Sequence, residues 1–389
     1  MPITIDGRTF AVPGVYGTVE VIQQGSVSLP VFNGLLIVGT AKQGIGYDAG
    51  KGGEVIKSFS NIAEAAAFFG YSSPIVAAMA EAKKGGAGVV HALCVNPLTR
   101  ASANITDGTN PLFTLKPKTY GAPGADNKIS ITVVSNNVTV QITRAFSVFC
   151  AANVLVNDTV LTLESVEGLN VGDNIYLLDN TDTTEGTAKT ITLIDTVNKK
   201  ITVASTFGNA CATADYARIV RLETGSQLTR VFDKTSATFL NDLVAYIQSS
   251  GLFEVSSIST TAVPSNITSQ GGFLGLITGA TKGTSPSGTL SAAGLTGKIQ
   301  QLLEEWTNTT KARIRIVNLV RNGEALSGTV NAWKPVATTL RQAGSSIQIV
   351  IGADSGAIAN DVSNSNSPAY IAKYSINSQD IIRAGGGYD

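Results

Sequence analysis

The stretch from Val31 to Val95 constrains the fold of this 389-residue chain more than any other. It holds two almost wholly apolar runs, VFNGLLIVGTAK and GVVHALCV, separated by a glycine-rich loop and two segments with helical spacing. Strands that are covered on both faces of a sheet have such continuous apolar runs, and parallel neighbours need a crossover between them. We therefore predict a strand, a loop, two helices and a second strand.

The two helices carry recognisable terminal signals. Asn61, with Glu64 three residues later, has the spacing of an N-terminal capping box. Ser73-Pro74 is expected to open the next helix and Gly85-Gly86 to end it, the usual placement of proline and glycine. One face of this second helix would collect apolar residues and pack onto the sheet: Ile75, Ala78, Met79 and Ala82.

Several segments, taken in order, resemble the contractile phage tail sheath proteins. They are PGVY (Pro13–Tyr16), VGTAKQG (Val38–Gly44), a helix that closes on FFG (Asn61–Gly70), and a run with KKGGAGVV (Ala77–Val95). A later segment, TYGAPGADNKISITV (Thr119–Val133), is also similar to the family. The resemblance covers residues 10–135 well and the chain after Arg221 in outline only. Its strength is the order of the segments, because each alone is a common β/α feature.

The first 30 residues have an extended character, since proline and several glycines interrupt their apolar positions. Such a segment can add to the edge of another sheet, although a frayed terminus is the alternative. The resemblance implies an N-terminal arm that connects neighbouring subunits. The arm residues expected to make this contact are Pro13, Gly14, Val15, Tyr16, Val19 and Val21.

The middle of the chain is rich in β runs. LFTLKPK, KISITVV and VTVQITRAF come first, with Asn136-Asn137 as an expected hairpin turn. From Cys150 the runs become shorter, namely VLVN, TVLTLE, NIYLLD, KTITLIDT and KKITVAS. Between Ala151 and Ile219 nine acidic residues stand against four basic ones, a net charge of −5. We predict an acidic all-β barrel or sandwich, inserted into the host domain and facing outward.

After Arg221 the pattern changes to alternating strands and helices, which is typical of a mostly parallel sheet with helices on its faces. One helix is expected over Phe239–Ile247 with its end at Gly251, and another from Ser291 through Trp306. The remaining expected elements are strands at Arg313–Val320, Ser346–Gly352 and Asp380–Ala384, a helix that ends at Gly344 with Pro335 in its first turn or at its start, and a short helix opening at Ser367-Pro368.

The predicted fold class is therefore α/β with additional β domains. Its parts are an extended arm (1–30), a β/α core formed by 31–149 together with 220–389, and the inserted all-β domain (150–219). The last residues, IIRAGGGYD, place a triple-glycine turn after a strand. Such a turn normally leads to another element, so we expect the sequence to be a portion of a longer product.

Few residues here suit catalysis or ligand binding. His91 is the only histidine and no G-x-S-x-G motif occurs, so a serine hydrolase is not expected and His91 is interpreted as a core or interface residue. The Gly44–Gly53 loop matches neither phosphate-binding glycine pattern and is interpreted as a flexible inter-subunit or turn loop. Cys94, Cys150 and Cys211 are widely spaced, so no metal site is predicted. Reduced thiols are expected, with a disulfide between Cys150 and Cys211 or between subunits as the alternative.

Composition fits an assembly protein. Only 14% of residues are charged, and 28 basic residues balance 28 acidic ones, so no basic surface for nucleic acid is indicated. No signal peptide and no membrane-spanning run is visible.

The resemblance implies a structural, non-enzymatic subunit of a contractile tail sheath in the virion, assembled in the host cytoplasm. Its implied partners are other copies of itself in hexameric, helically stacked rings, the tail tube protein, and the baseplate and tail terminator proteins. No catalytic residue, cofactor or small-molecule substrate is expected. Two alternatives remain open: an α/β enzyme or phosphate-ligand-binding protein that uses Gly44–Gly53, and another β-rich virion assembly protein.

Overall fold

The structure is a computed structural model that describes residues 3–5, 8–10, 34–344, 347–352 and 381–384. It divides into two units, Met1–Phe32 and Asn33–Asp389. In the first unit, β1 (Ile3–Ile5) and β2 (Arg8–Phe10) pair in antiparallel fashion. The arm residues Pro13 to Val21 and the short helix expected at Ser367-Pro368 lie outside the described residues.

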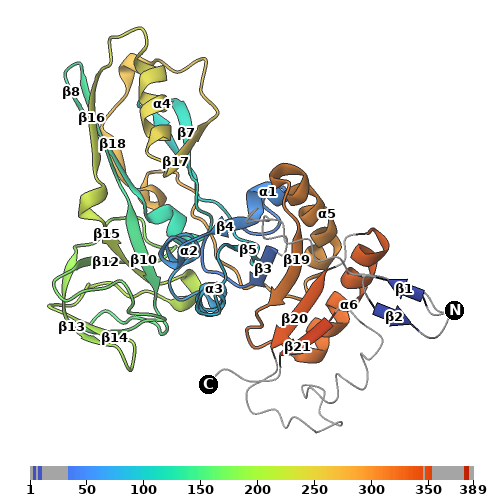
Figure 1. Cartoon of the computed structure of the whole chain (residues 1–389). Coiled ribbons are helices and arrows are strands. Elements are labelled where there is room, and N and C mark those ends of the chain that lie inside the picture. Colours follow the sequence, from blue (N-terminus) through green and yellow to red (C-terminus); the bar gives the residue numbers. More distant parts are fainter. Residues whose placement is uncertain (1–2, 6–7, 11–33, 345–346, 353–380, 385–389) are drawn as a thin grey trace. The chain divides into compact units, whose positions relative to one another are not determined.

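A six-stranded β/α sheet organises the second unit, with the strand order β21-β20-β19-β3-β5-β4 (Figure 1). All neighbours in this sheet are parallel except β4, which runs antiparallel to β5. Its strands are β3 (Gly34–Gly39), β4 (Lys57–Phe59), β5 (Val90–Cys94), β19 (Ile314–Leu319), β20 (Gln348–Gly352) and β21 (Ile381–Ala384). Its helices are α1 (Gly52–Val55), α2 (Ile62–Phe69), α3 (Pro74–Lys84), α5 (Ala293–Thr310) and α6 (Leu326–Gln342).

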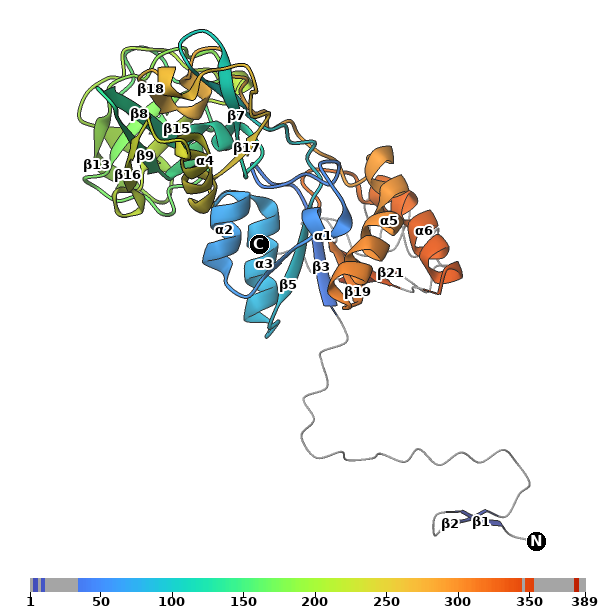
Figure 2. The same cartoon turned by 90° about the horizontal axis from the view of Figure 1, so that it is seen from above.

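The central strands of this sheet are covered on both faces, which confirms the interpretation of their apolar runs. Leu36 and Val38 of β3 belong to the core that α5 and α6 cover, whereas Ile37 belongs to the core under α2 and α3. Figure 2 shows the two helix pairs on opposite sides of β3 and β5. Alternate side chains of one strand therefore supply two separate cores.

The predicted crossover between β3 and β5 is confirmed, with two additions. Asn61 Oδ1 accepts a hydrogen bond from the Ala63 amide at 2.9 Å, so it caps α2. The helix α3 begins at Pro74 and ends with Gly85 at its C-cap. The additions are α1 and the edge strand β4, each too short to show a periodic pattern in the sequence.

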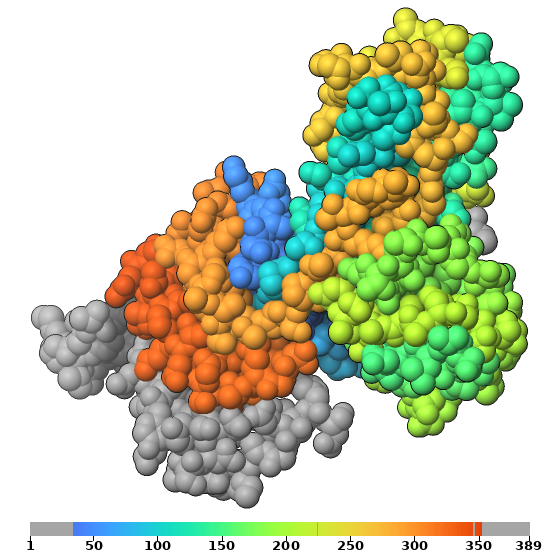
Figure 3. Space-filling model, turned by 180° about the vertical axis from the view of Figure 1, so that it is seen from behind, coloured from blue at the N-terminus to red at the C-terminus, as the bar shows by residue number. Residues whose placement is uncertain are grey.

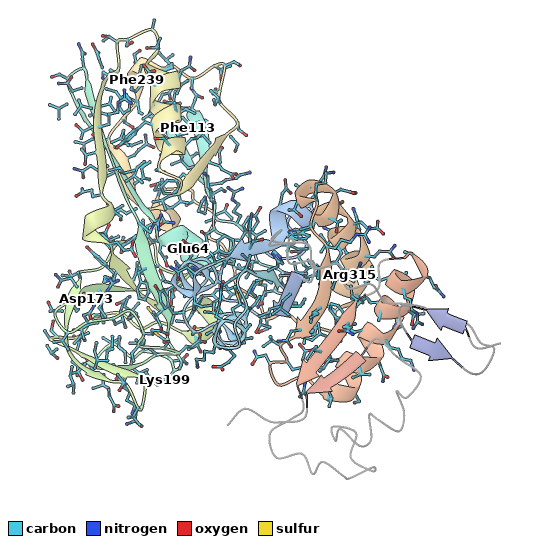
Figure 4. All side chains as sticks on the ribbon, in the orientation of Figure 1. Glu64, Phe113, Asp173, Lys199, Phe239 and Arg315 are labelled. Carbon is cyan, nitrogen blue, oxygen red and sulfur yellow. The ribbon has the colours of Figure 1, made fainter. Side chains whose placement is uncertain are left out.

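A second group of strands, which lies between β5 and β19 in the sequence, forms an all-antiparallel unit that we call the β unit. Its two sheets have the orders β16-β9-β8-β18 and β17-β7-β6, and they share one apolar core with α4. Phe113 and Phe239, labelled in Figure 4, lie in this core. The elements are β6 (Ala103–Thr106), β7 (Pro111–Pro117), η1 (Ala122–Asp126), β8 (Lys128–Val134), β9 (Asn137–Thr143), η3 (Thr224–Ser226), β16 (Leu228–Asp233), α4 (Phe239–Ser249), β17 (Phe253–Ser256), η4 (Pro264–Asn266), β18 (Gln270–Phe273) and η5 (Leu274–Leu276).

The expectation of a mostly parallel sheet directly after Arg221 is wrong. The strands β16, β17 and β18 pair antiparallel with β9, β7 and β8, and parallel pairing resumes only at β19. A strand–helix–strand succession gives parallel neighbours only when both strands enter the same sheet. Here α4 connects β16 to β17, which lie in different sheets. The expected hairpin turn also shifts by one residue, because β9 already begins at Asn137 and Ser135 takes the positive φ of 55°.

The acidic segment forms a closed barrel, drawn in green tones in Figures 1 and 3. Its strand order is β10-β15-β12-β13-β14-β11. The first and last strands meet through the Cys150–Leu163 bridge, where the Ala151 amide donates to the Thr162 carbonyl at 2.8 Å. The elements are β10 (Ala145–Phe149), β11 (Val160–Thr162), β12 (Asn174–Leu178), β13 (Lys189–Asp195), β14 (Lys200–Val203), η2 (Thr213–Asp215) and β15 (Arg218–Leu222).

Two details of the barrel differ from the sequence prediction. Its strands run from Ala145 to Leu222, several residues beyond the expected limits on each side. The run VLVN is no strand, because only Val154 forms a bridge, with Cys211. The sequence alone assigns the β10 residues to the preceding hairpin, since they follow β9 with a single residue between them.

Pro335 lies inside α6 rather than in its first turn, so that expectation is wrong. The helix begins at Leu326, nine residues earlier, because Leu326, Val330 and Trp333 already contribute to its buried face. Trp333 is fully buried and its Nε1 donates to the Leu290 carbonyl at 2.8 Å. This packing offsets the hydrogen bond that a proline removes from a helix. No helix in the described ranges has the length and apolar character needed to cross a membrane.

Candidate functional site

Three of the segments that carry the family resemblance meet at one point, which we call the junction (Gly44, Phe69 and Tyr120). Gly44 and Tyr120 exchange both backbone hydrogen bonds, at 3.2 and 2.7 Å. The amides of Lys42 and Gln43 both donate to the Phe69 carbonyl at 3.3 Å. The junction therefore joins the end of β3, the end of α2 and the segment leading to η1.

The backbone at the junction requires glycine. Gly44 has a φ of +113°, in a region that other residues rarely adopt. A Cβ atom there would lie 2.9 Å from Cδ1 of Phe69, closer than real contacts allow. Gly121, also at positive φ, would place a Cβ atom 2.8 Å from the Lys42 carbonyl oxygen. The close approach of these segments explains why glycine stands at both positions.

A buried ion pair connects η1 of the β unit to the barrel. Arg218 of β15 donates from Nε and Nη2 to the two carboxylate oxygens of Asp126, each at 2.7 Å. Only 2% of the arginine side chain and 1% of the aspartate side chain are exposed. Ser147 of β10 donates to the same carboxylate at 2.6 Å. Bidentate geometry and an additional donor are the features that allow a charge pair to be buried.

A second ion pair connects the barrel to the β/α sheet. Lys42 Nζ lies 2.7 Å from Oε1 of Glu164, and Ser72 Oγ donates to Oε2 of the same carboxylate at 3.1 Å. These groups line a cavity of about 260 Å³. The barrel is thus held to both of its neighbours in the chain by paired charges, and these contacts could not be read from the sequence because their partners lie 92 and 122 residues apart.

His91 is half-buried on β5, as expected of a core or interface histidine. Its Nδ1 lies 2.7 Å from Oγ of Ser58 on β4, and its ring packs edge-on against Trp306 with centroids 4.7 Å apart. Burial lowers the pKa of His91 below its usual value, which favours the neutral ring. Within the described ranges no carboxylate is hydrogen-bonded to this ring, whereas the base of a catalytic triad is oriented by one. The contact between His91 and Ser58 could not be predicted from the sequence, because no strand was expected at β4.

The Gly44–Gly53 loop is packed rather than open. The Gly52 amide donates to Oε2 of Glu305 at 2.8 Å, and Lys298 Nζ donates to the Gly50 carbonyl at 3.1 Å. A Cβ atom on Gly52 would lie 1.8 Å from the Leu302 carbonyl oxygen of α5. The Gly52 amide, which a bound phosphate would need as a donor, is therefore already hydrogen-bonded to the Glu305 carboxylate. The loop is a close helix contact, and the interpretation as a flexible loop is wrong in this respect.

The three cysteines are buried free thiols. Burial raises the pKa of Cys94 and of Cys150 to about 12. Burial and the carboxylates of Asp182 and Asp179 also raise the pKa of Cys211.

Asp179, Asp182 and Cys211 place one potential ligand atom each within 4.8 Å of one another. The carboxylates, however, accept hydrogen bonds from the local turn: Asp179 Oδ1 from the Thr181 amide at 2.7 Å, and Asp182 Oδ2 from the Asp179 amide at 2.8 Å. We interpret this cluster as a turn that satisfies its own backbone.

No protein-family model matches this chain, and no curated protein matches it. Among solved structures, the chain is similar to the sheath tail protein Lin1278 from Listeria innocua, with 12% sequence identity and a TM-score of 0.39. The match covers 90% of this chain and 50% of that protein, so the chain spans half the length of the solved structure.

Proposed function

We propose that this chain is a structural subunit of a contractile tail sheath. The observation that carries the proposal is the junction. Segments that resemble the sheath family in sequence order, VGTAKQG, the FFG helix end and TYGAPG, are also the segments that bond to each other through Gly44, Phe69 and Tyr120. If these were chance matches to common β/α turn sequences, the three segments would not be expected to contact one another.

The nested organisation of the chain supports a mechanical role. The chain leaves the β/α sheet after β5, enters the β unit, forms the barrel, and returns by way of the β unit to β19. Each unit is therefore connected to the next by two passes of the chain. A subunit that moves by rearranging rigid bodies needs such stiff units with defined connections. The described residues that could serve chemistry, such as His91 and Gly52, are engaged in packing.

The proposed partners follow from this role. Other copies of the chain would form stacked hexameric rings around a tail tube, with the N-terminal arm adding to a neighbour's sheet edge. Tail tube, baseplate and tail terminator proteins would be its contacts in the virion, and the barrel would face outward. Contraction would be a rigid-body rearrangement that drives the tube through the host envelope.

Electron microscopy and sedimentation of the purified full chain test this proposal. We expect rings or tubes. Replacing Val15, Val19 and Val21 by aspartate should abolish them while the subunit stays folded, as should removal of residues 1–20. Replacing Thr18, Gln23 and Gln24 by aspartate adds the same charge and serves as the control. Small closed oligomers from the unaltered chain, or normal tubes without residues 1–20, would contradict the proposal.

The alternative of a phosphate-ligand-binding protein or α/β enzyme predicts a different outcome. A thermal-shift screen with ATP, GTP and NAD should show no stabilisation if the chain is a sheath subunit, because a bound nucleotide would raise the melting temperature. Another virion assembly protein would pass this screen but would not form tubes of stacked rings.

A further inference from the structure

The cavity beside Lys42 lies where parallel sheets commonly bind ligands. The chain continues from β3 to β5 on one side, and β19 lies on the other side of β3, so the strand order reverses direction here. Residues within three positions of the ends of these three strands line the cavity: Thr40 after β3, Asn96 after β5 and Asn322 after β19. Crevices at the carboxyl ends of strands, at such a switch point, are the general ligand position of α/β sheets.

The lining is built of hydrogen-bond donors. Lys42 supplies an ammonium group, and Ser72 and Ser287 supply hydroxyl groups. The helix α3, eleven residues long, begins at Pro74 on the same wall, and its dipole favours an anion there. These features alone would only describe a polar surface.

An unpartnered hydroxyl group makes the cavity a candidate site. Thr40 is only 6% exposed, and its Oγ1 has no hydrogen-bond partner among the residues that the structure describes. Buried polar groups without a partner are rare and call for an explanation, such as a missing ligand. A hydroxyl on the wall of a cavity can donate to an oxygen atom of a bound anion.

The cavity already holds one anionic group of the protein itself. The Glu164 carboxylate reaches in from the segment after β11 of the barrel, with one oxygen on Lys42 and the other on Ser72. A carboxylate whose two oxygens meet an ammonium group and a hydroxyl has the same arrangement as a bound oxyanion.

We propose that this cavity is an oxyanion-binding site whose resident occupant is the side chain of Glu164. A free oxyanion of the phosphate or carboxylate class and Glu164 exclude each other, because both need Lys42 and Ser72. Withdrawal of Glu164 opens the site, and Thr40 then becomes a further donor to the incoming anion. The site is distinct from the Gly44–Gly53 loop, whose Gly52 amide is engaged by Glu305.

The test uses the full chain and inorganic phosphate as the probe, with calorimetry at constant ionic strength. Glu164→Ala should bind phosphate about tenfold more tightly than the unaltered chain, a difference of about 1.4 kcal/mol by the tenfold conversion. Glu167→Ala removes the same charge from an exposed position three residues further on and should not differ from the unaltered chain. Acetate in place of phosphate distinguishes a site for carboxylates from one for dianions.

Two further variants make the result decisive. Adding Lys42→Met or Thr40→Val to Glu164→Ala should return phosphate binding to the level of the Glu167→Ala control. If Glu164→Ala is misfolded by circular dichroism, Glu164→Ser replaces it, because its short side chain remains polar but leaves Lys42 and Ser72 open to the anion. The proposal is overturned if the folded Glu164 variant binds no more tightly than the control, or if tight binding survives the loss of Lys42.

Discussion

Arg218 and Asp126 lie 92 residues apart and form a two-pronged ion pair that is almost completely excluded from solvent. The pair joins the barrel to the end of η1, which a single residue separates from β8. Because the pair is buried, removing either partner would leave the other charge without compensation. The contact between the barrel and the β unit therefore depends on both residues.

Arg218→Ala should lower the free energy of unfolding by about 3–5 kcal/mol, because it leaves the Asp126 charge buried without a partner. Chemical unfolding followed by fluorescence measures the change. Arg221→Ala is the matched control: its pair with Asp173 has 20% of each side chain exposed, so we expect a loss of about 1 kcal/mol. The double variant Arg218→Met with Asp126→Leu should recover most of the stability. Equal losses for the two arginines would contradict the role assigned to burial.

Removal of the barrel should leave the rest of the chain folded. The Glu223 amide donates to the Arg144 carbonyl at 2.9 Å, so the two ends of the barrel are neighbours and a short glycine-serine linker can join them. Circular dichroism and thermal unfolding report whether the shortened chain folds. A molten or insoluble product would show that the barrel is needed for folding.

Gly52→Ala should be strongly destabilising, by about 2 kcal/mol or more, because overpacking against a backbone atom forces α1 and α5 apart. Gly297→Ala provides the comparison, since this glycine lies within α5 and a Cβ atom added there would meet nothing within 4 Å. Alanine there should raise stability by about 0.5–1 kcal/mol through its helix propensity. Urea denaturation measures both, and a neutral Gly52→Ala variant would show that the helix contact is loose.

The three thiols should be unreactive toward thiol reagents in the native protein at pH 8. Burial raises the pKa of Cys94 and Cys150 to about 12, so almost no thiolate is present. Denaturation should release three equivalents of reactive thiol, and mobility on a non-reducing gel should equal that on a reducing gel. Fewer than three equivalents would indicate the alternative disulfide between Cys150 and Cys211.

Acidification should weaken the fold partly through His91. Burial lowers its pKa in the folded state, so the unfolded chain binds a proton first as pH falls below about 6.5. The stability that the neutral ring contributes is fully present above that pH and declines below it. His91→Gln, which keeps a partner for Ser58, should lose less stability than the unaltered chain between pH 7 and pH 5.5. Parallel pH profiles for the two proteins would exclude this origin.

Sequence periodicity predicts the β/α part well because burial sets the pattern there. The helix expected from Ser291 through Trp306 is α5, and its buried face is formed by Leu295, Ile299, Leu302, Leu303 and Trp306. The parallel pairing of β3 with β5, and of β20 with β21, also follows from alternation.

Strand pairing and the contacts between units could not be predicted, because they depend on partners far apart in the chain. The β16 sequence, LTRVFD, shows no alternation that would indicate which sheet it enters, and only its pairing with β9 shows the choice. The cavity at Thr40 is assembled from segments around residues 40, 72, 96, 164, 285 and 322. Of these, only the glycine-bracketed VGTAKQG segment carries a signal in the sequence. Pro335 misled the prediction for a different reason. Proline normally marks the start of a helix, but here the packing of buried Trp333 keeps the preceding residues helical.

Closure of the barrel determines which surfaces of this chain can recruit another strand. A cylinder whose first and last strands are bonded offers no unpaired main-chain edge to a strand of another chain. In the proposed sheath, strand exchange would use an open sheet, such as the one that ends at β16, where Leu228 and Val231 are exposed. The chain thereby separates a surface without a free strand edge from one that has such an edge, and in the proposed sheath the second surface would set the geometry of the filament.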